Sequence, residues 1–552
     1  MSGRAPDRRS AESRREAFPG SARDWCGLAV AALIYCCLGL WQLHLPGLYE
    51  DEALTAVPAA RLVQGRGGGP YALLPGRLDL PLMVSDHVGP IETYLVLPFF
   101  AAFGVGTIAA RGYEFLCGLA ALVLIFLWAR RVAPGMAWAA ALVLAPMPSL
   151  WLAFRCGLYL SSAVVPLAAG ALLCLDGWHR GRGARWLYGG CLLMGLGLAT
   201  KILFVWLIIG IAIGVMVANR PLLRRLDQRG LVVSAAWFAV GAAPLIVFNL
   251  LSRGLTLRTL LANLGETQYG VRNAAFLANL RTQLGSLASL LDGGWLAWAG
   301  DTPSNPAAPW LLAVAAGWIA LRWRAPDWRR ARFCVVALMA IVAASCFTIT
   351  RLGPQYLLLA LVLPGPIIAA ALASAWGERH RLLGQIAFPA LAALCLMQLA
   401  GDVVGSLRYH RALAATRGVG LFSTAHDDAA RFLAGEKEGR PLAGDWGLLH
   451  NIELASGGQV RPGPVFELSE TAPFAFTRAA ARRALTAPGR VWLFHTEDLA
   501  VAPRRRAAVE EEAAALGLRL QRVAVFGDGL GRPVVLVYRS VAAGGRPAAG
   551  RR

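Results

Sequence analysis

Residues 25–53 read WCGLAVAALIYCCLGLWQLHLPGLYEDEA, an apolar run without Asp, Glu, Lys or Arg that ends at the acids Glu50, Asp51 and Glu52. About 20 apolar residues are enough to carry a helix across the hydrocarbon core of a bilayer. An arginine-rich N-terminus precedes the run and no small-residue cleavage site follows it, which predicts a retained span with a cytoplasmic N-terminus. The acidic cluster is therefore expected just beyond the first span, on the far side of the membrane.

Charge-free stretches of similar length recur along the chain, at residues 132–154, 156–175, 230–252, 352–377 and 382–401. With 57% hydrophobic and only 16% charged residues, the chain is too apolar to be a soluble globular protein. We predict an α-helical polytopic membrane protein with about eleven transmembrane helices. A small C-terminal extracytoplasmic α/β domain completes the predicted fold.

The formal net charge of +21 would suggest a nucleic-acid partner in a soluble protein, but here the arginines lie in short clusters between the apolar stretches. Such clusters are typical of cytoplasmic loops in membrane proteins. This orientation predicts a multi-pass protein of the cell inner membrane, with no nucleic-acid partner and with residues 46–110 and 251–308 as external loops. Residues 91–103 are apolar but too short to cross, which predicts a helix lying in the interface.

The domain organisation follows from where the composition changes. We expect a cytoplasmic tail at 1–24, a transmembrane domain at 25–407, a periplasmic α/β domain at 408–540 and a disordered tail at 541–552. Within the α/β domain, strands are predicted at 491–494, 520–526 and 534–538, and a helix at 503–516.

The predicted topology gathers acids and bases at one membrane surface. They are Glu50, Asp51, Glu52, Asp86, His87, Arg155, Lys201 and Arg351, with Tyr159, Gln355 and Tyr356 close by. A carboxylate can take a proton from an acceptor hydroxyl, and guanidinium or ammonium groups can stabilise a departing phosphate. Because nucleotide-activated sugars are cytoplasmic, a donor carried by a membrane lipid fits this side better.

Several short motifs, in this order, resemble the GT-C superfamily of membrane glycosyltransferases, in particular its branch of dolichyl-phosphate-mannose protein mannosyltransferases and aminoarabinose transferases. They are Tyr49-Glu50-Asp51-Glu52-Ala53, Asp86-His87-Val88-Gly89-Pro90, Phe154-Arg155, the glycine-leucine stretch 195–200 before Lys201, and Gly353-Pro354-Gln355-Tyr356. One departure is that no acid follows Arg155 closely, which puts a second acidic site and a metal there in doubt.

The resemblance implies a glycosyltransferase, of the hexosyl or pentosyl kind, that moves a sugar from a polyprenyl-phosphate donor to a hydroxyl of a lipid, glycan or protein acceptor on the extracytoplasmic face. It implies catalytic roles for Asp51 and Glu52, and binding of the donor phosphate by Arg155, Lys201 and Arg351. Candidate substrate contacts are Glu50, Asp86, His87, Tyr159, Gln355 and Tyr356. No metal ligands are predicted and no cofactor is required by the sequence, although a divalent metal stays open.

Other interpretations of the same features stay open. The chain could be a polytopic lipid or sugar transporter or flippase without transferase activity, or a scaffold that uses its α/β domain. The acids could belong to a solvated loop, and the basic residues at span ends could anchor helices at the interface. Asp445, His450, His495 and Asp528 suggest a hydrolase, but no nucleophile elbow or metal-ligand spacing accompanies them.

Overall fold

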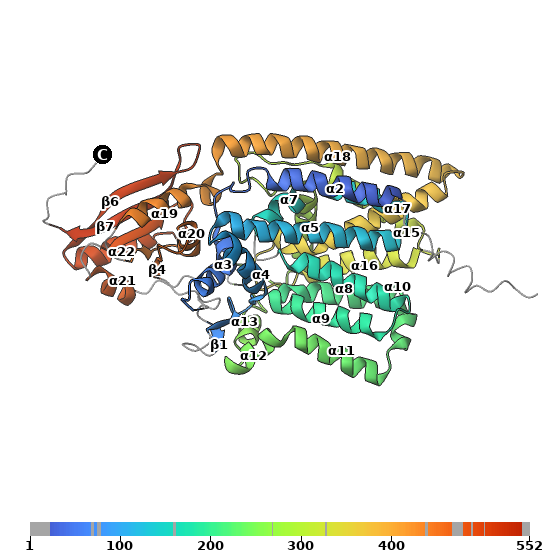
Figure 1. Cartoon of the computed structure of the whole chain (residues 1–552), viewed down its shortest axis with the longest axis horizontal. Helices are drawn as coiled ribbons and strands as arrows, with labels where there is room; N and C mark the ends of the chain where they lie inside the picture. The colour runs from blue at the N-terminus through green and yellow to red at the C-terminus, as the bar shows by residue number, and fades with distance from the viewer. Residues whose placement is uncertain are drawn as a thin grey trace, which may run out of the picture.

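The computed structural model describes residues 22–67, 71–73, 79–157, 162–267, 269–325, 328–436, 440–465, 478–486, 490–501 and 503–543. A bundle of helices, with their long axes roughly side by side, carries a smaller α/β domain at one end (Figure 1). This is the predicted combination of a helical bundle and a small C-terminal sheet. Most of both predicted tails, residues 1–21 and 544–552, lies outside the described residues.

The bundle is built from apolar helices whose outer faces also carry large apolar side chains. In α18 (Leu382–Thr416), for example, Ile386, Leu396 and Val404 are each more than 60% exposed. Such a surface is suited to lipid rather than water. The other helices of the bundle are α2 (Ala22–Leu40), α5 (Thr107–Val132), α6 (Ala137–Leu144), α7 (Pro148–Arg155), α8 (Val164–His179), α9 (Ala184–Thr200), α10 (Val205–Ala218), α11 (Gln228–Gly241), α12 (Ala243–Leu251), α15 (Ala307–Leu321), α16 (Arg329–Ala344) and α17 (Pro364–Gly377), with the 3-10 turns η1 (Ile202–Phe204), η2 (Arg220–Arg225) and η4 (Pro354–Val362).

Three helices in the described part of the chain, α2, α5 and α18, are each long and apolar enough to cross a membrane. Three bent pairs, α6 with α7, α11 with α12 and η4 with α17, raise the number to six if each pair is one span. Shorter apolar helices are α4 (Ile91–Phe103), α8, α15 and the segment Ile202–Ala218. The chain is thus an integral membrane protein, and the count of about eleven spans stays a prediction.

Loops that the sequence places together on the cytoplasmic side touch one another. Asp176, near the end of α8, lies 2.9 Å from Arg180, 3.6 Å from Arg131 and 3.0 Å from Arg330 in carboxylate to guanidinium contacts. These residues come from α8, the end of α5 and the start of α16. The grouping of these loops agrees with the predicted topology, whereas the compartment that they face stays a prediction.

The opposite end of the bundle, next to the α/β domain, is covered by short elements. They are α3 (Glu50–Val63), α4, α13 (Leu255–Ala262), α14 (Phe276–Asp292) and the hairpin of β1 (Tyr71–Leu73) and β2 (Leu80–Met83). We call this end the C-domain end (Figure 1). The helix predicted at residues 91–103 is present as α4, which packs against α3 and α5.

The C-terminal domain is a five-stranded sheet with the order β4-β3-β5-β7-β6. Alternate side chains of β5 and β7 serve two cores: Leu493 and Val537 lie on one face, Trp492 and Tyr538 on the other. The strands are β3 (Leu442–Ala443), β4 (Gly463–Pro464), β5 (Val491–His495), β6 (Leu518–Gly527) and β7 (Pro533–Ala542), and the helices are η5 (Gly420–Phe422), α19 (Ala425–Gly435), α20 (His450–Ala455), α21 (Arg478–Leu485) and α22 (Arg505–Ala515). The predicted boundary at residue 408 falls inside α18, which continues to Thr416.

A chain of polar side chains is buried inside this domain. His495 contacts Asp445 (Nδ1 to Oδ2, 3.0 Å) and His426 (Nε2 to Nε2, 3.1 Å). The Nδ1 atom of His426 lies 3.3 Å from the Ser423 carbonyl oxygen. Burial lowers the pKa of His426 to about 3, and the neighbouring His495 lowers it as well. The folded domain therefore contains a buried histidine, His426, that is neutral at ordinary pH.

We expect the C-terminal domain to lose stability as the pH falls from 6.5, the ordinary pKa of histidine, to about 3. Over this window His426 takes up a proton in the unfolded chain but not in the folded domain, so acid favours unfolding. At about 1.36 kcal/mol per pKa unit the loss reaches about 5 kcal/mol. Thermal unfolding of the full chain, measured across this pH range, checks the expectation.

The matched variants are His426→Gln and His380→Gln, because His380 is an exposed loop residue at the start of α18. His426→Gln should flatten the pH dependence, whereas His380→Gln should leave it as in the natural chain. A pH dependence that is equally steep in both variants would contradict the assignment.

Candidate functional site

The acidic cluster forms the first turn of α3. Tyr49 caps this helix with an extended backbone, and its carbonyl oxygen accepts the backbone N–H groups of Glu52 and Ala53 at 3.1 and 3.2 Å. Acids at a helix N-terminus are stabilised by the unpaired N–H groups and the helix dipole. The helical turn points the three carboxylates in different directions, and each one meets a different partner.

Glu50 reaches into the C-terminal domain. Its carboxylate accepts hydrogen bonds from the backbone N–H groups of His450 and Asn451 at 3.1 and 3.3 Å, and it lies 2.6 Å from Nδ1 of the His450 ring. The side chain is 1% exposed. Glu50, predicted as a substrate contact, therefore joins α3 to the start of α20.

Glu52 points the other way, into the bundle, where it pairs with Arg111 of α5. The Nε and Nη2 atoms of Arg111 donate to the two carboxylate oxygens at 2.6 and 2.9 Å, and both side chains are buried. Arg111 also donates to the carbonyl oxygens of Leu43 and Pro46 at 3.0 and 2.8 Å. This pair fixes the turn between α2 and α3, which suits Glu52 to positioning the cluster. Its predicted catalytic role remains untested.

Asp51 is half-buried and acts electrostatically on Lys201, the residue that follows α9. Burial lowers the pKa of Lys201 to about 8, while the carboxylates of Asp51 and Glu92 oppose this shift by stabilising the ammonium. Its Nζ atom lies 5.4 Å from the centre of the Tyr356 ring, within cation–π range. An acid, an ammonium and an aromatic ring, each predicted from the sequence, thus lie close together at the C-domain end.

The segment that carries Asp86 and His87 is bound to the Lys201 segment by backbone contacts. Val88 and Lys201 form an antiparallel bridge, and the Gly89 N–H donates to the carbonyl of Thr200 at 3.0 Å. A Cβ atom at Gly89 would lie 1.7 Å from the Ala199 carbonyl oxygen, so only glycine permits this approach.

Asp86 and His87 form a hydrogen-bonded pair beside this bridge, with 2.9 Å between Oδ1 and Nδ1. The second oxygen of Asp86 accepts the Thr259 hydroxyl of α13 at 2.5 Å. Burial raises the pKa of Asp86, but the bonds from His87 and Thr259 outweigh it and hold the pKa below its ordinary value. The Asp86 carboxylate therefore fixes the orientation of the His87 ring.

Arg155 does not reach this group. Its guanidinium donates to the backbone carbonyl oxygens of Gly39, Trp41 and Leu45 at 3.3, 2.7 and 2.5 Å, and the side chain is fully buried. These contacts hold the segment between α2 and α3. They offer no support for the predicted binding of a lipid phosphate by Arg155.

The remaining predicted residues have separate places. Arg351 is exposed, and its guanidinium carbon lies 5.0 Å from the centre of the Tyr269 ring. Gln355 is half-buried at the start of η4, one residue before Tyr356. Tyr159 lies outside the described residues.

Two residues near the site were not among the sequence-predicted candidates. Glu92, at the start of α4, is buried and accepts the backbone N–H of Ala163 at 3.0 Å. The sequence could have pointed to Glu92, because it is the one charged residue in this run of 13 residues. Arg111 was not singled out from the sequence, although a charge in the second turn of a spanning helix already indicates a buried partner.

A cavity of about 10 Å³ lies beside Lys201, between Tyr356 and apolar residues of α8 and η4. This is room for about one water molecule. Within the described residues no group of three His, Cys, Asp or Glu side chains is placed to hold a metal ion. The groups that the site offers for chemistry are therefore a carboxylate and a nearby cation.

The fold of this chain, a bundle of apolar helices with an α/β domain at one end, is similar to that of solved membrane glycosyltransferases, which confirms the predicted resemblance at the level of fold. The solved structures that it resembles include ArnT from Cupriavidus metallidurans. The form bound to undecaprenyl phosphate matches with a TM-score of 0.54 and 15% identity over 94% of this chain and 98% of that chain. The apo form matches with a TM-score of 0.51 and 15% identity over 93% and 97%.

The arabinofuranosyltransferase AftD from Mycobacteria aligns with a TM-score of 0.43 and 18% identity over 95% of this chain and 40% of that chain. No protein-family model and no curated protein sequence matches the chain. At these identities the likeness to ArnT concerns the fold.

We expect Arg111→Gln to destabilise the protein strongly, because it leaves the Glu52 carboxylate buried without its cation. Breaking a buried ion pair in this way costs about 3–5 kcal/mol. The thermal unfolding midpoint of the purified chain should fall well below that of Arg229→Gln, which removes an exposed arginine. The double variant Arg111→Gln with Glu52→Gln should regain part of the loss. If Arg111→Gln unfolds at the same temperature as Arg229→Gln, the pair does not hold the turn.

Proposed function

We propose that this protein is a glycosyltransferase of the extracytoplasmic face of the cell inner membrane, moving a sugar from a polyprenyl-phosphate donor to an acceptor hydroxyl. The observation that carries the proposal is the electrostatic interaction of Asp51 with the Lys201 ammonium, which lies against the Tyr356 ring at the C-domain end of the bundle. A lipid-linked donor brings its phosphate to such a membrane edge and leaves its chain in the bilayer. The reaction then needs one base and one cation, and the site offers both.

In the proposed reaction, the Asp51 carboxylate takes the proton of the acceptor hydroxyl as its oxygen forms a bond to the anomeric carbon of the donor sugar. The bond from that carbon to the phosphate oxygen breaks, and its electron pair leaves with the polyprenyl phosphate. The Lys201 ammonium stabilises the negative charge that develops on this oxygen. Proton, electron pair and sugar are thereby accounted for without another reactant.

The choice of Asp51 follows from the contacts of its neighbours. Glu50 is bonded to His450 and Glu52 to Arg111, so moving either carboxylate to an acceptor would break a buried contact. Lys201 is likewise favoured over Arg155, whose guanidinium is taken up by backbone carbonyls. Arg351, exposed beside Tyr269, is retained as a second contact for the lipid phosphate.

Two further observations support the donor and the sidedness. ArnT, whose fold this chain shares, was solved with undecaprenyl phosphate bound, which makes a polyprenyl phosphate the leading donor lipid by analogy of fold. The arginine-rich loops gather around Asp176, at the other end of the helices from Asp51. Under the positive-inside rule this supports a periplasmic location for the C-domain end.

We expect Asp51→Asn to lower the rate of sugar transfer by about 10²–10⁴-fold, the usual contribution of a general base. The measurement is turnover of purified polyprenyl-phosphate sugars by the full chain in detergent, with donor binding measured separately. Asp498→Asn, the same change at an exposed position of the C-terminal domain, should keep the natural rate. Near-normal transfer by Asp51→Asn would contradict the role of Asp51 as the general base.

The transfer rate should also fall as the pH rises through about 8, the pKa of Lys201. The ammonium form stabilises the leaving phosphate, so activity is present below this pKa and is lost above it. Lys201→Arg should move this fall to higher pH, because a guanidinium stays protonated there. A pH profile that is identical in the natural chain and in Lys201→Arg would rule out this role for Lys201.

A further inference from the structure

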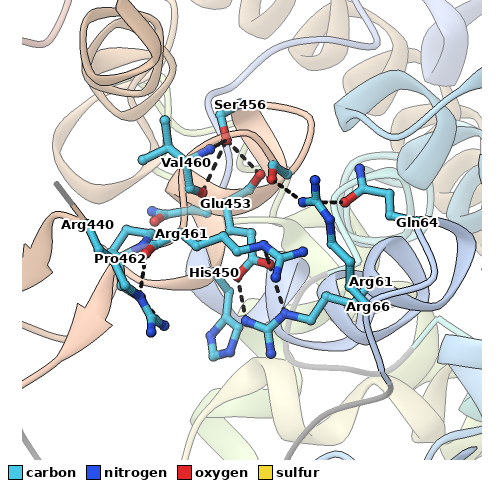
Figure 2. Close-up of polar contacts among 12 residues, drawn as sticks. Arg61, Gln64, Arg66, Arg440, His450, Glu453, Ser456, Val460, Arg461 and Pro462 are labelled. Carbon is cyan, nitrogen blue, oxygen red and sulfur yellow. Dashed lines mark hydrogen bonds and ion pairs between the residues drawn. The ribbon is translucent and has the colours of Figure 1, made fainter. Parts of the chain in front are cut away.

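Four arginines converge where the end of α3 meets the C-terminal domain (Figure 2). Arg61 and Arg66 come from the last turn of α3 and the turn that follows it, and Arg440 and Arg461 come from the C-terminal domain. We call this group the seam arginines. The group lies away from Asp51, and the proposed transfer reaction makes no use of it.

Glu453 of α20 is the carboxylate at the centre of this group. It accepts two hydrogen bonds from Arg61, at 2.8 and 2.5 Å, and lies 3.5 Å from Nε of Arg461. Arg66 donates to the Gly458 carbonyl at 2.8 Å, and Arg440 donates to the Arg461 carbonyl at 2.8 Å. One carboxylate thus serves two guanidiniums, while the other two are held in place by backbone oxygens.

A cavity of about 410 Å³ opens between these residues. Arg66, Arg440 and Arg461 line it, together with Gln459 and with Glu436, whose carboxylate is paired with Arg539 at 2.5 Å. Pockets that bind small molecules measure about 300–1,000 Å³. The cavity is therefore large enough for an anionic group, and the described residues of its wall include more cations than anions.

Arg461 has hydrogen-bond donors that the described residues do not satisfy. Its Nε and Nη2 atoms are buried, and although Nε lies within ion-pair range of Glu453, neither atom has a hydrogen-bond acceptor among the described residues. Burial lowers the pKa of Arg461, Glu453 opposes the shift, and the nearby Arg66, Arg61 and Arg440 lower it again. Buried donors without acceptors are costly, and like charges held together repel. An oxyanion in the cavity would accept hydrogen bonds from these donors and would reduce the repulsion among the arginines.

The position of the cavity indicates what carries that oxyanion. Arg61 follows Asp51 by ten residues, which places it about 15 Å further along α3 at a rise of 1.5 Å per residue. The helices α3 and α20 meet at both places, through Glu50 with His450 and through Arg61 with Glu453. A group bound at the seam is too far away to react, but it can belong to an acceptor that extends to Asp51.

We propose that the seam arginines bind a phosphate or carboxylate group of the acceptor, as a recognition site separate from the reacting hydroxyl. Guanidinium forks match the paired oxygens of both groups. The assignment of the ligand as the acceptor rests on the proposed function, whereas the binding of an oxyanion does not. The acceptor would accordingly be an acidic glycan or glycolipid.

The test is equilibrium binding of two probes, inorganic pyrophosphate and glucuronate, to the full chain in detergent, with glucose as the neutral comparison. We expect Arg66→Gln, Arg440→Gln and Arg461→Gln each to weaken binding about tenfold, the loss of one charge-assisted contact. Arg483→Gln, at an exposed position of α21, is the matched control and should bind as the natural chain does. Added salt should weaken binding further.

Equal binding by the three seam variants and by Arg483→Gln would overturn the proposal, and so would binding of glucose as tight as that of glucuronate. The variants come from both sides of the seam, so one that fails to fold leaves the others to decide. A lipid headgroup is distinguished from a soluble glycan by nanodiscs. Phosphatidic acid, but not phosphatidylcholine, should compete with pyrophosphate if the acceptor is a lipid, and neither should compete if it is a soluble glycan.

The binding test and the transfer assay can fail independently of each other. Asp51→Asn should bind pyrophosphate normally whether or not it transfers sugar. Arg461→Gln should raise the KM for an acidic acceptor about tenfold while kcat stays near normal, because the site binds without reacting. A loss of kcat with unchanged KM would contradict a recognition role.

Discussion

The site depends on how the turn between the first span and α3 is held. Arg111 and Arg155 rise from two bundle helices and together bind Glu52 and the backbone carbonyls of the connecting segment. Buried guanidiniums are costly without hydrogen-bond acceptors, so these contacts favour the observed arrangement of the segment. That arrangement directs Glu50 outward to the C-terminal domain and leaves Asp51 on the side of Lys201.

The same turn connects the two parts of the protein. Through Glu50 and Arg61, α3 is bonded at both ends to α20, so the C-terminal domain sits on the helix that carries the acids. Aromatic rings reinforce the junction, with Tyr49 stacked on Phe422 at 4.5 Å and Phe422 on Trp298 at 4.7 Å between ring centres. A domain attached in this way is placed to present an acceptor to the membrane edge, which is the role that we propose for the seam arginines.

The sequence was a good guide to whatever follows from hydropathy and order. The apolar runs predicted the helices, the short run at 91–103 predicted α4, and the arginine clusters predicted which loops meet around Asp176. It was a poor guide to which charges pair with each other. Glu50, Asp51 and Glu52 are adjacent acids of the same kind, and only the 100° rotation per residue of a helix, together with partners as distant as Arg111 and His450, separates their roles. The partners of Arg155 could not be predicted either, because they are backbone carbonyl oxygens, which every residue carries whatever its side chain.

The central claim is that the donor phosphate binds at Lys201 beside Asp51. The most direct measurement is a structure of the full chain with a polyprenyl phosphate bound. The account predicts phosphate oxygens within about 4 Å of Nζ of Lys201, the range of an ion pair, with the Asp51 carboxylate facing the same space. A phosphate bound at the opposite end of the bundle, among the arginines around Asp176, would contradict it.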